Sequence, residues 1–552
     1  MDIRRTILWM IFSFSLLLLW NNWQEHNGRP SLFASTPVEQ EQTKTTASND
    51  ISVPQAVERT STTPEIPTEE VAQSELVTVS SDVLKLAFDT VGAQLVRAEL
   101  LKYTYPSNPD QHVMLFDDSS ASTYMAQTGI IGAAAEQSFP THLTPFRLID
   151  NKTNPSTGEL EVAFEASTDD VRVIKTYYIN QTSYDIRVTT TVENLTTVAI
   201  TPSIYLQLTR DGNNPPDSSM LYRTFTGPVV YSEEEKFQKI DFSDIEKNKA
   251  KYATHVPDGW IGMVQHYFAT AWVPPQGVER TNQALQIGNN LFAVRTIYPL
   301  GMIGPHESVT TTDQLWVGPQ DQQAMEQVAK GLALVVDYGW FTILAKPLFT
   351  ILTWIHSLVG NWGWAIVLLT VLIKLVFYPL SAASYRSMAK MKQVTPRMQA
   401  IREKYKDDRV KQNTAMMELY RNEKINPLGG CLPMLVQIPV FIALYWVLLG
   451  SVEMRGAPWI LWIHDLAARD PWMILPAIMM LTMFLQIRLN PTPPDPLQAK
   501  VMMLMPLVFG GMMFFFPAGL VLYWVVNNAL SIAQQQYITK KIAKQSAAQK
   551  VG

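Results

Sequence analysis

The chain has 552 residues, 47% of them apolar, and a formal net charge of −5 at pH 7. This length allows more than one domain, and the single cysteine, Cys431, excludes an intrachain disulfide and a cysteine-based zinc cluster. A Gly-x-Ser-x-Gly turn and a phosphate-binding loop are both missing from the sequence. The histidines between residues 76 and 320 lack metal-ligand spacing. We therefore expect no enzymatic activity, no catalytic residues, no metal and no cofactor.

The N-terminal segment, residues 1–25, begins with Arg4 and Arg5 and continues as an apolar run. Basic residues before such a run favour a cytoplasmic N-terminus, so the segment is either a transmembrane anchor or a cleaved signal peptide. The anchor is preferred because the weak cleavage signal at 31–35 lies well past the apolar run. Residues 26–75 are rich in Thr, Ser, Pro, Glu and Gln, a composition that predicts a disordered linker.

Apolar and polar residues alternate in many short stretches between residues 76 and 325. Examples of the apolar positions are Leu84, Leu86, Phe88, Ile186, Val188, Val192, Ile204, Leu206 and Leu208. A period of two predicts strands, and the Asn, Gly, Pro and Ser residues between them predict turns. We expect an all-β sandwich domain, which lies outside the cytoplasm because it follows the first anchor. A sugar ligand for this domain remains an alternative.

The segment 326–358 is apolar but interrupted by Asp337, Lys346 and Pro347. Tryptophans gather near its end, at positions 340, 354, 362 and 364. Aromatic residues of this kind favour the membrane–water interface, so we predict an amphipathic helix in the interface on the non-cytoplasmic side. A separate transmembrane helix is the alternative.

Five apolar segments follow, at residues 361–380, 428–450, 471–487, 501–516 and 519–537. Together with the anchor they predict a polytopic α-helical membrane protein with six transmembrane helices and both termini in the cytoplasm. The charges agree, because the loop 381–427 holds eleven Lys and Arg residues and the tail 541–552 is also basic, whereas the loop 451–470 holds only two. The two shortest segments cover only about 24–26 Å as helices, so they either thin the bilayer locally or pack without tilt while flanking residues reach out to the headgroups.

The first of these segments, 361–380, carries a single charge, Lys374. An ionisable side chain inside a bilayer is costly and indicates a functional site, although a lysine can also extend its ammonium group to the lipid headgroups. Helical spacing puts Thr370 and Tyr378 on the same face as Lys374. We interpret this face as part of a substrate groove.

Further polar or amphipathic side chains occur in the other predicted spans. In the groove hypothesis they line it with Lys374: Gln437, Tyr523, Trp524, Asn527, Asn528 and Ser531. Thr482 and Gln486 lie in a fourth span. Each could simply bond to a neighbouring helix. Taken together with Lys374, they predict a water-filled, positively charged groove that opens to the cytoplasm.

The basic loop predicts a cytoplasmic helical hairpin at 384–426, with a new helix starting at Thr395-Pro396 and a turn at 406–408. Methionines mark the hairpin, namely Met391, Met398, Met416 and Met417. Methionine-rich surfaces suit varied apolar partners, but these residues could equally pack one arm on the other. The excess of Lys and Arg suits contact with anionic membrane lipids or with the ribosome, or serves only to fix topology.

Four motifs in the C-terminal half, at 426–433 (NPLGGCLP), 438–445 (IPVFIALY), 462–466 (WIHDL) and 516–523 (FPAGLVLY), resemble the YidC membrane protein insertase family. The resemblance implies insertion of nascent membrane proteins into the bacterial inner membrane, alone or with the Sec translocon. It also implies a five-helix insertase core at 359–540 and a large periplasmic domain, a β-supersandwich without assigned catalysis. DNA is not among the implied partners.

The resemblance further implies a positive residue in the groove, usually arginine, at the position that Lys374 occupies here. Lysine keeps the charge but lacks the planar fork of five donors that grips a carboxylate at two points. Two other functions remain as alternatives. The chain could be an anion transporter or channel, although its spans show no internal repeat, or it could be a membrane-anchored periplasmic carbohydrate-binding protein.

Overall fold

The computed structural model describes residues 74–551 apart from short gaps, and all of these residues belong to one compact unit that spans 52–552. The gaps are residues 107, 120–121, 133–136, 217–223, 337, 339–340, 407, 424–431 and 490–495. The predicted anchor at 1–25, the predicted linker up to residue 73 and Cys431 therefore lie outside the described residues.

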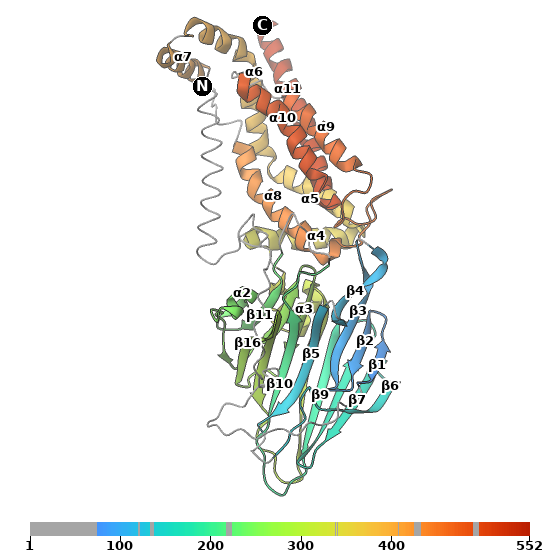
Figure 1. The fold of residues 1–552 in the computed structure, drawn as a ribbon. Coiled ribbons are helices and arrows are strands. Elements are labelled where there is room, and N and C mark those ends of the chain that lie inside the picture. The colour runs from blue at the N-terminus through green and yellow to red at the C-terminus, as the bar shows by residue number, and fades with distance from the viewer. Residues whose placement is uncertain are drawn as a thin grey trace. The chain divides into compact units, whose positions relative to one another are not determined.

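The first part of the described chain is a sandwich of two antiparallel sheets with nine strands each (Figure 1). The first sheet has the order β1 (Leu76–Ser80), β2 (Leu84–Asp89), β3 (Gln94–Tyr105), β4 (Asn108–Ser119), β5 (Ser122–Ile131), β10 (Ser203–Asp211), β17 (Leu291–Pro299), β16 (Arg280–Gly288) and β13 (His255–Val256). The second has the order β12 (Lys236–Lys239), β11 (Gly227–Ser232), β14 (Trp260–Gln265), β15 (Phe268–Val273), β18 (Ser308–Pro319), β9 (Asp185–Asn194), β8 (Val171–Ile179), β7 (Leu160–Ser167) and β6 (Arg147–Thr153). The predicted β-sandwich is confirmed.

The alternation in the sequence corresponds to the two faces of each strand. Along β8 every second residue is buried, from Val171 through Val173 and Tyr177 to Ile179. Because successive side chains of a strand point to opposite faces, this row faces the other sheet and forms part of the core. Strand β10 is buried on both faces for almost its whole length, as expected for a strand at the centre of its sheet.

Helix α2 (Phe242–Glu246) lies between β12 and β13, and α3 (Gln322–Val328) and the 3-10 turn η1 (Leu332–Val335) lead from the last strand to the helical part of the chain. The Asp321 carboxylate caps α3 by accepting hydrogen bonds from the backbone N–H groups of Gln323 and Ala324, at 3.0 and 3.1 Å. Such a cap satisfies donors that the first helical turn leaves without partners.

The helical part contains α4 (Thr342–Val359), α5 (Trp362–Val376), α6 (Tyr378–Lys404), α7 (Arg409–Asn422), α8 (Leu432–Gly450), η4 (Val452–Met454), α9 (Ile474–Leu489), α10 (Pro496–Met513) and α11 (Ala518–Val551). Helix α11 is central because it packs against α5, α6, α8 and α9. Helix α10 packs on α9, and α4 packs on α5 and α8.

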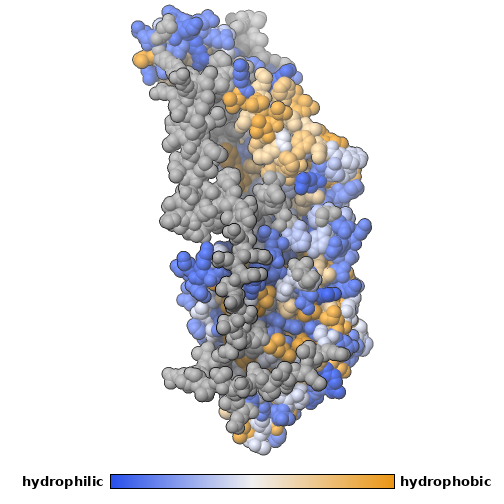
Figure 2. All heavy atoms as spheres, viewed as in Figure 1, coloured by the Kyte–Doolittle hydropathy of each residue, from blue (hydrophilic) through white to orange (hydrophobic). Residues whose placement is uncertain are grey.

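Figure 2 shows hydrophobic side chains gathered over the helical part and hydrophilic ones over the α6–α7 hairpin. Helix α10 contributes strongly to the exposed apolar surface, with Val501, Met503, Leu504, Met505, Leu507 and Val508 all more than half exposed. An apolar helix surface of this extent is stable in contact with lipid acyl chains rather than water. It agrees with the predicted membrane domain.

Among the described helices, only α4 is by itself long and apolar enough to cross a membrane. Helices α5 and α6 pass the same test together but are bent by 67° at their junction. The apolar stretches Gln437–Gly450, Ile474–Leu489 and Lys500–Met513 are shorter. The count of six transmembrane helices and the interfacial position of α4 therefore stay predictions. Helix α4 buries one face, consisting of Ala345, Phe349, Leu352 and Ile355.

Two predicted helix boundaries are wrong. The segment 361–380 is not one helix, because α5 ends at Val376 and α6 starts at Tyr378. Pro379 in the first turn of α6 lacks the N–H that would continue the α5 ladder, which explains a bend here. No new helix starts at Pro396, since α6 continues through it and the Thr395 hydroxyl donates to the Met391 carbonyl at 3.0 Å.

Candidate functional site

Lys374 lies two residues before the end of α5 and is half-buried. Its Nζ donates a hydrogen bond to Ser531 Oγ of α11 at 2.8 Å. The ion pairs of the described residues do not include Lys374. Among the described residues, the hydrogen-bond partner of its ammonium group is thus a neutral hydroxyl. No described carboxylate forms an ion pair with this charge.

Helix α11 connects this lysine to two other helices. Ser531 Oγ donates to the backbone carbonyl of Asn527 at 2.7 Å, one turn earlier. The Asn527 side-chain oxygen accepts a short hydrogen bond from Gln437 Nε2 of α8. Asn528 Nδ2 donates to Thr482 Oγ1 of α9 at 3.3 Å. Polar side chains of α5, α8, α9 and α11 therefore meet along one stretch of α11.

Thr370 lies one helical turn before Lys374 in α5, but its hydroxyl forms a hydrogen bond within its own helix. It is 1% exposed and donates to the Ile366 carbonyl at 2.7 Å. Such a bond satisfies a hydroxyl without a partner on another helix. The structure therefore gives Thr370 a buried position in α5 and a hydrogen bond within its own helix.

Tyr378 is not brought to the site. The bend between α5 and α6 places it at the start of α6, where it is 42% exposed. The face shared by residues 370, 374 and 378 assumed one straight helix, so the bend at Phe377 removes the basis for including Tyr378.

Tyr523 and Trp524 contribute aromatic surface rather than hydrogen bonds to Lys374. Tyr523 is 2% exposed, and its ring stacks on Phe441 of α8 with centroids 6.1 Å apart. The Trp524 ring meets Phe441 edge-on at 4.7 Å and Phe509 of α10 at 5.4 Å. These rings form an apolar wall between α8, α10 and α11, next to the polar residues of α11.

One contributor was not predicted. The side chain of Tyr385 of α6 lies near Ser531. The sequence places Tyr385 seven residues beyond Tyr378, in a segment read only as the start of the hairpin. The signal that would have found it is the packing of α6 against α11, which no local pattern encodes.

Methionines of the hairpin mostly hold its two arms together. Met398 is 4% exposed and forms a small core with Val394, against which Met391 and Met416 pack. Met417 differs, because it is 66% exposed. A salt bridge between Arg397 and Glu423, at 2.5 Å, also joins the two arms.

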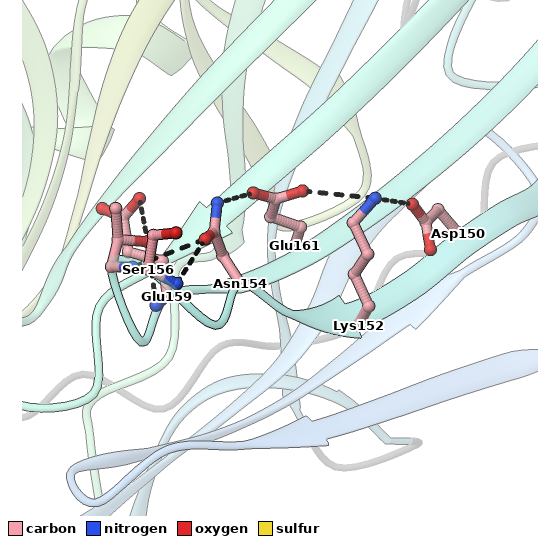
Figure 3. A network of polar contacts seen from close by, with 7 residues as sticks. Asp150, Lys152, Asn154, Ser156, Glu159 and Glu161 are labelled. Carbon is pink, nitrogen blue, oxygen red and sulfur yellow. Dashed lines mark hydrogen bonds and ion pairs between the residues drawn. The ribbon is translucent and has the colours of Figure 1, made fainter.

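The β-domain also carries polar side-chain networks. Figure 3 shows a polar network on the β6–β7 hairpin, in which Lys152 Nζ lies between the carboxylates of Asp150 (2.5 Å) and Glu161 (3.7 Å). Asn154 Nδ2 donates to Glu161 Oε1 at 2.8 Å, and Asn154 Oδ1 accepts from the Ser156 backbone at 2.9 Å. These groups satisfy one another at the surface. Among the described residues, no group of three or more His, Cys, Asp or Glu side chains could hold a metal.

A second feature of the β-domain is the fully buried Lys175 of β8. Its Nζ donates to the carbonyl oxygens of Gly92 and Thr128, at 2.8 and 2.9 Å, and lies 4.5 Å from the centroid of the Phe146 ring. Burial without a nearby carboxylate lowers the pKa of Lys175 to about 7. Because Thr128 belongs to the first sheet and Lys175 to the second, this side chain joins the two sheets.

Comparison with known proteins identifies the family. The family model described as 60Kd inner membrane protein matches residues 354–545, and the model described as YidC periplasmic domain matches residues 76–351. The membrane protein insertase YidC of Bordetella avium is 63% identical over 559 residues, covering 99% of this chain and 100% of that protein. The chain belongs to the YidC membrane protein insertase family. The insertase of Burkholderia multivorans is 49% identical, covering 98% of this chain and 99% of that protein.

Solved structures are more distant. A crystal structure of an active YidC insertase has 18% sequence identity and a TM-score of 0.39, covering 84% of this chain and 93% of that chain. A galactose mutarotase related enzyme from Lactobacillus acidophilus has 8% identity and a TM-score of 0.29, covering 44% of this chain and 97% of that chain. Neither likeness is close enough to indicate function.

Membership of the YidC family establishes the activity. The protein is a membrane protein insertase of the inner membrane with a periplasmic β-domain, and its cargo is nascent membrane proteins. It is not an enzyme, because an insertase moves a polypeptide without changing covalent bonds. This assignment takes the place of the transporter and carbohydrate-binding alternatives for the whole chain.

Proposed function

We propose that the insertase receives the hydrophilic, acidic flank of a nascent segment in a polar groove between α5, α8, α9 and α11, and that Lys374 attracts this flank. The observation that supports the proposal most directly is the environment of the Lys374 ammonium group. It donates to Ser531 at 2.8 Å and has no carboxylate partner among the described residues. An uncompensated positive charge of this kind attracts an incoming carboxylate over several ångströms.

The neighbouring side chains suit the next step. Asn527, Asn528 and Gln437 carry amides that can exchange their present hydrogen bonds for bonds to a passing peptide group or its water. Beside them, the rings of Trp524 and Phe441 offer an apolar surface. In our proposal the polar flank stays with the amides while the apolar part of the segment slides over the aromatic wall into lipid.

The energy for insertion comes from the partitioning of the segment itself. Burying apolar surface in lipid is favourable by roughly 25 cal/mol per Å², and the sequence lacks a phosphate-binding loop that would use a nucleotide. The short helix α9, at 16 residues, supports local bilayer thinning as an additional aid.

We extend the proposal to topology and partners. Both termini and the α6–α7 hairpin lie in the cytoplasm, because the basic residues concentrate there. Helix α4 lies in the periplasmic interface with its buried face on α5 and α8. The Sec translocon is proposed from the family resemblance, and the ribosome from the basic surface of the hairpin.

The test uses the full chain in vesicles and two small substrates that differ only in the charge of the flank, one acidic and one neutral. We compare Lys374→Glu, Lys374→Arg and Ser531→Ala. Lys374→Glu should insert the acidic substrate at least about tenfold more slowly, since reversing a charge at 4 Å changes the interaction from about −1 to about +1 kcal/mol even in water, a difference of about 2 kcal/mol. The neutral substrate should be affected little, and Lys374→Arg should insert both.

Ser531→Ala is the matched control, because it removes the hydrogen-bond partner of Lys374 and keeps the charge. It should reduce insertion of both substrates to a similar, small extent. Equal insertion of the acidic substrate by Lys374→Glu and by the unchanged protein would refute the charge attraction.

A further inference from the structure

A cavity of about 140 Å³ lies between α6, the end of α9 and the C-terminal half of α11. The described residues of its lining include Tyr385, Lys392, Leu489, Gln535, Thr539 and Lys540, and none of the described lining residues is acidic. The two ammonium groups take part in none of the ion pairs of the described residues. The lining therefore offers hydrogen-bond donors and positive charge from two different helices, which favours an anionic ligand.

The position of the cavity restricts the kind of anion. Helix α9 is apolar until it ends with Arg488 and Leu489, and α11 changes from apolar to basic near Lys540 and Lys541. The cavity thus lies where the apolar surface of the helices gives way to charged surface, the level of lipid headgroups. Basic pockets between membrane helices on the cytoplasmic side are a recurring site for anionic headgroups.

The size and the apolar part of the lining agree with such a ligand. A cavity needs roughly 10–15 Å³ to hold one water molecule, so about 140 Å³ has room for a phosphate group. Leu489, Met388 and Ala389 line the same cavity and suit the glycerol and the first methylene groups that follow a lipid phosphate. A hydrophilic ion alone would leave this apolar surface uncovered.

We propose that this cavity binds the phosphate group of an anionic phospholipid, held by Lys392 of α6 and Lys540 of α11. The bound lipid would join the helix of the cytoplasmic hairpin to the helix that carries the polar residues of the groove. Tyr385 connects the two places, since it lines the cavity and its side chain lies near Ser531. The headgroup therefore fixes the angle at which α6 leaves the groove.

The test measures lipid retention by the full chain in nanodiscs of phosphatidylcholine with 30 mol% phosphatidylglycerol, a proportion of about one in three that leaves competition between the lipids visible. The double variant Lys392→Gln/Lys540→Gln removes both ammonium groups of the cavity. The control Lys390→Gln/Lys541→Gln removes the same net charge from exposed lysines that do not line it. Native mass spectrometry then counts tightly held phosphatidylglycerol.

We expect the cavity variant to bind phosphatidylglycerol about 30-fold more weakly, which corresponds to two juxtamembrane lysines. The affinity of the control variant for phosphatidylglycerol should stay within about twofold of that of the unchanged protein, because its lysines contribute only to the diffuse electrostatic field of the surface. Equal losses in the two double variants would overturn the specific site. Equal retention of phosphatidylcholine and phosphatidylglycerol would overturn the role of the anion.

Two further arms identify the source of the anion. Inorganic phosphate or glycerol 3-phosphate at millimolar concentration should not displace the lipid, and displacement would show a site for soluble phosphate instead. A peptide with an acidic flank should not compete either, and competition would mean that the cavity receives substrate. Lys374→Glu should retain the lipid normally, so the lipid site and the proposed charge attraction can fail independently.

Discussion

Asp313 of β18 gives the protein a pH-dependent stability that can be calculated. The side chain is fully buried, and its Oδ1 accepts a hydrogen bond from the Tyr298 hydroxyl at 2.6 Å. Its other oxygen, Oδ2, has no hydrogen-bond partner among the described residues. Burial raises the pKa of Asp313 from 3.8 to about 7, because the charged form would lose its hydration.

The direction in which the unfolding free energy changes with pH follows from proton binding. Between about pH 4 and pH 7 the folded protein keeps the Asp313 proton, whereas the unfolded chain releases it. The stabilisation is therefore complete below about pH 4 and is lost as the pH rises to about 7. A pKa difference between 3.8 and about 7 corresponds to up to about 4 kcal/mol of unfolding free energy.

The substitution Asp313→Asn keeps the shape and removes the titration. Relative to the unchanged protein, the variant should become more stable with rising pH, by up to about 4 kcal/mol between pH 4 and pH 7, and the difference should be constant above pH 7. Hydrogen exchange of the β17 and β18 amides in the full chain, followed against urea at each pH, measures this difference. Asp185→Asn should show the same effect at a smaller size, up to about 3 kcal/mol between pH 4 and pH 6, because burial raises the pKa of Asp185 only to about 6. Identical pH slopes for Asp313→Asn and the unchanged protein would refute the reasoning.

Two other substitutions test buried contacts. Burial lowers the pKa of Lys175 to about 7, so between pH 7 and about pH 10 the unfolded chain holds more protons than the folded protein. The free energy of unfolding should therefore rise by up to about 1.4 kcal/mol per pH unit in this range. Lys175→Met should abolish this rise, as measured by urea titrations. Gly363→Ala would put a Cβ 2.2 Å from Trp459 Cδ1, so we expect the free energy of unfolding to fall by about 1–3 kcal/mol and the tryptophan fluorescence spectrum to change. Gly511→Ala, whose Cβ meets no atom within 4 Å, should show neither effect.

Local patterns predicted the elements of the fold well where burial alternates strictly. Strand β9 is an example, because the period of two through Ile186, Val188 and Val192 identifies both the strand and its buried face. The order of the strands was not predictable, since β5 pairs with β10 and β10 with β17 across long separations in the sequence. Such pairings depend on the fit of whole sheets rather than on any local signal.

Some residues of the candidate site were predictable from the sequence, but their contacts were not. A charge inside an apolar run identified Lys374, and its partner Ser531 was among the polar residues named for the last span. Periodicity failed for Tyr378, because it assumes a straight helix and the chain bends by 67° at Phe377. It could not find Tyr385 at all, since the contact with Ser531 depends on how two helices pack.

The bend at Phe377 has a mechanical consequence. Helix α6 is uninterrupted for 27 residues, so it forms a stiff arm about 40 Å long. A rotation of only about 10° at this joint would displace the far end of the arm by about 7 Å, by simple geometry from that length. A small change of angle at Phe377 is therefore enlarged at the tip of the hairpin, and the packing of α6 against α11 and α8 limits it.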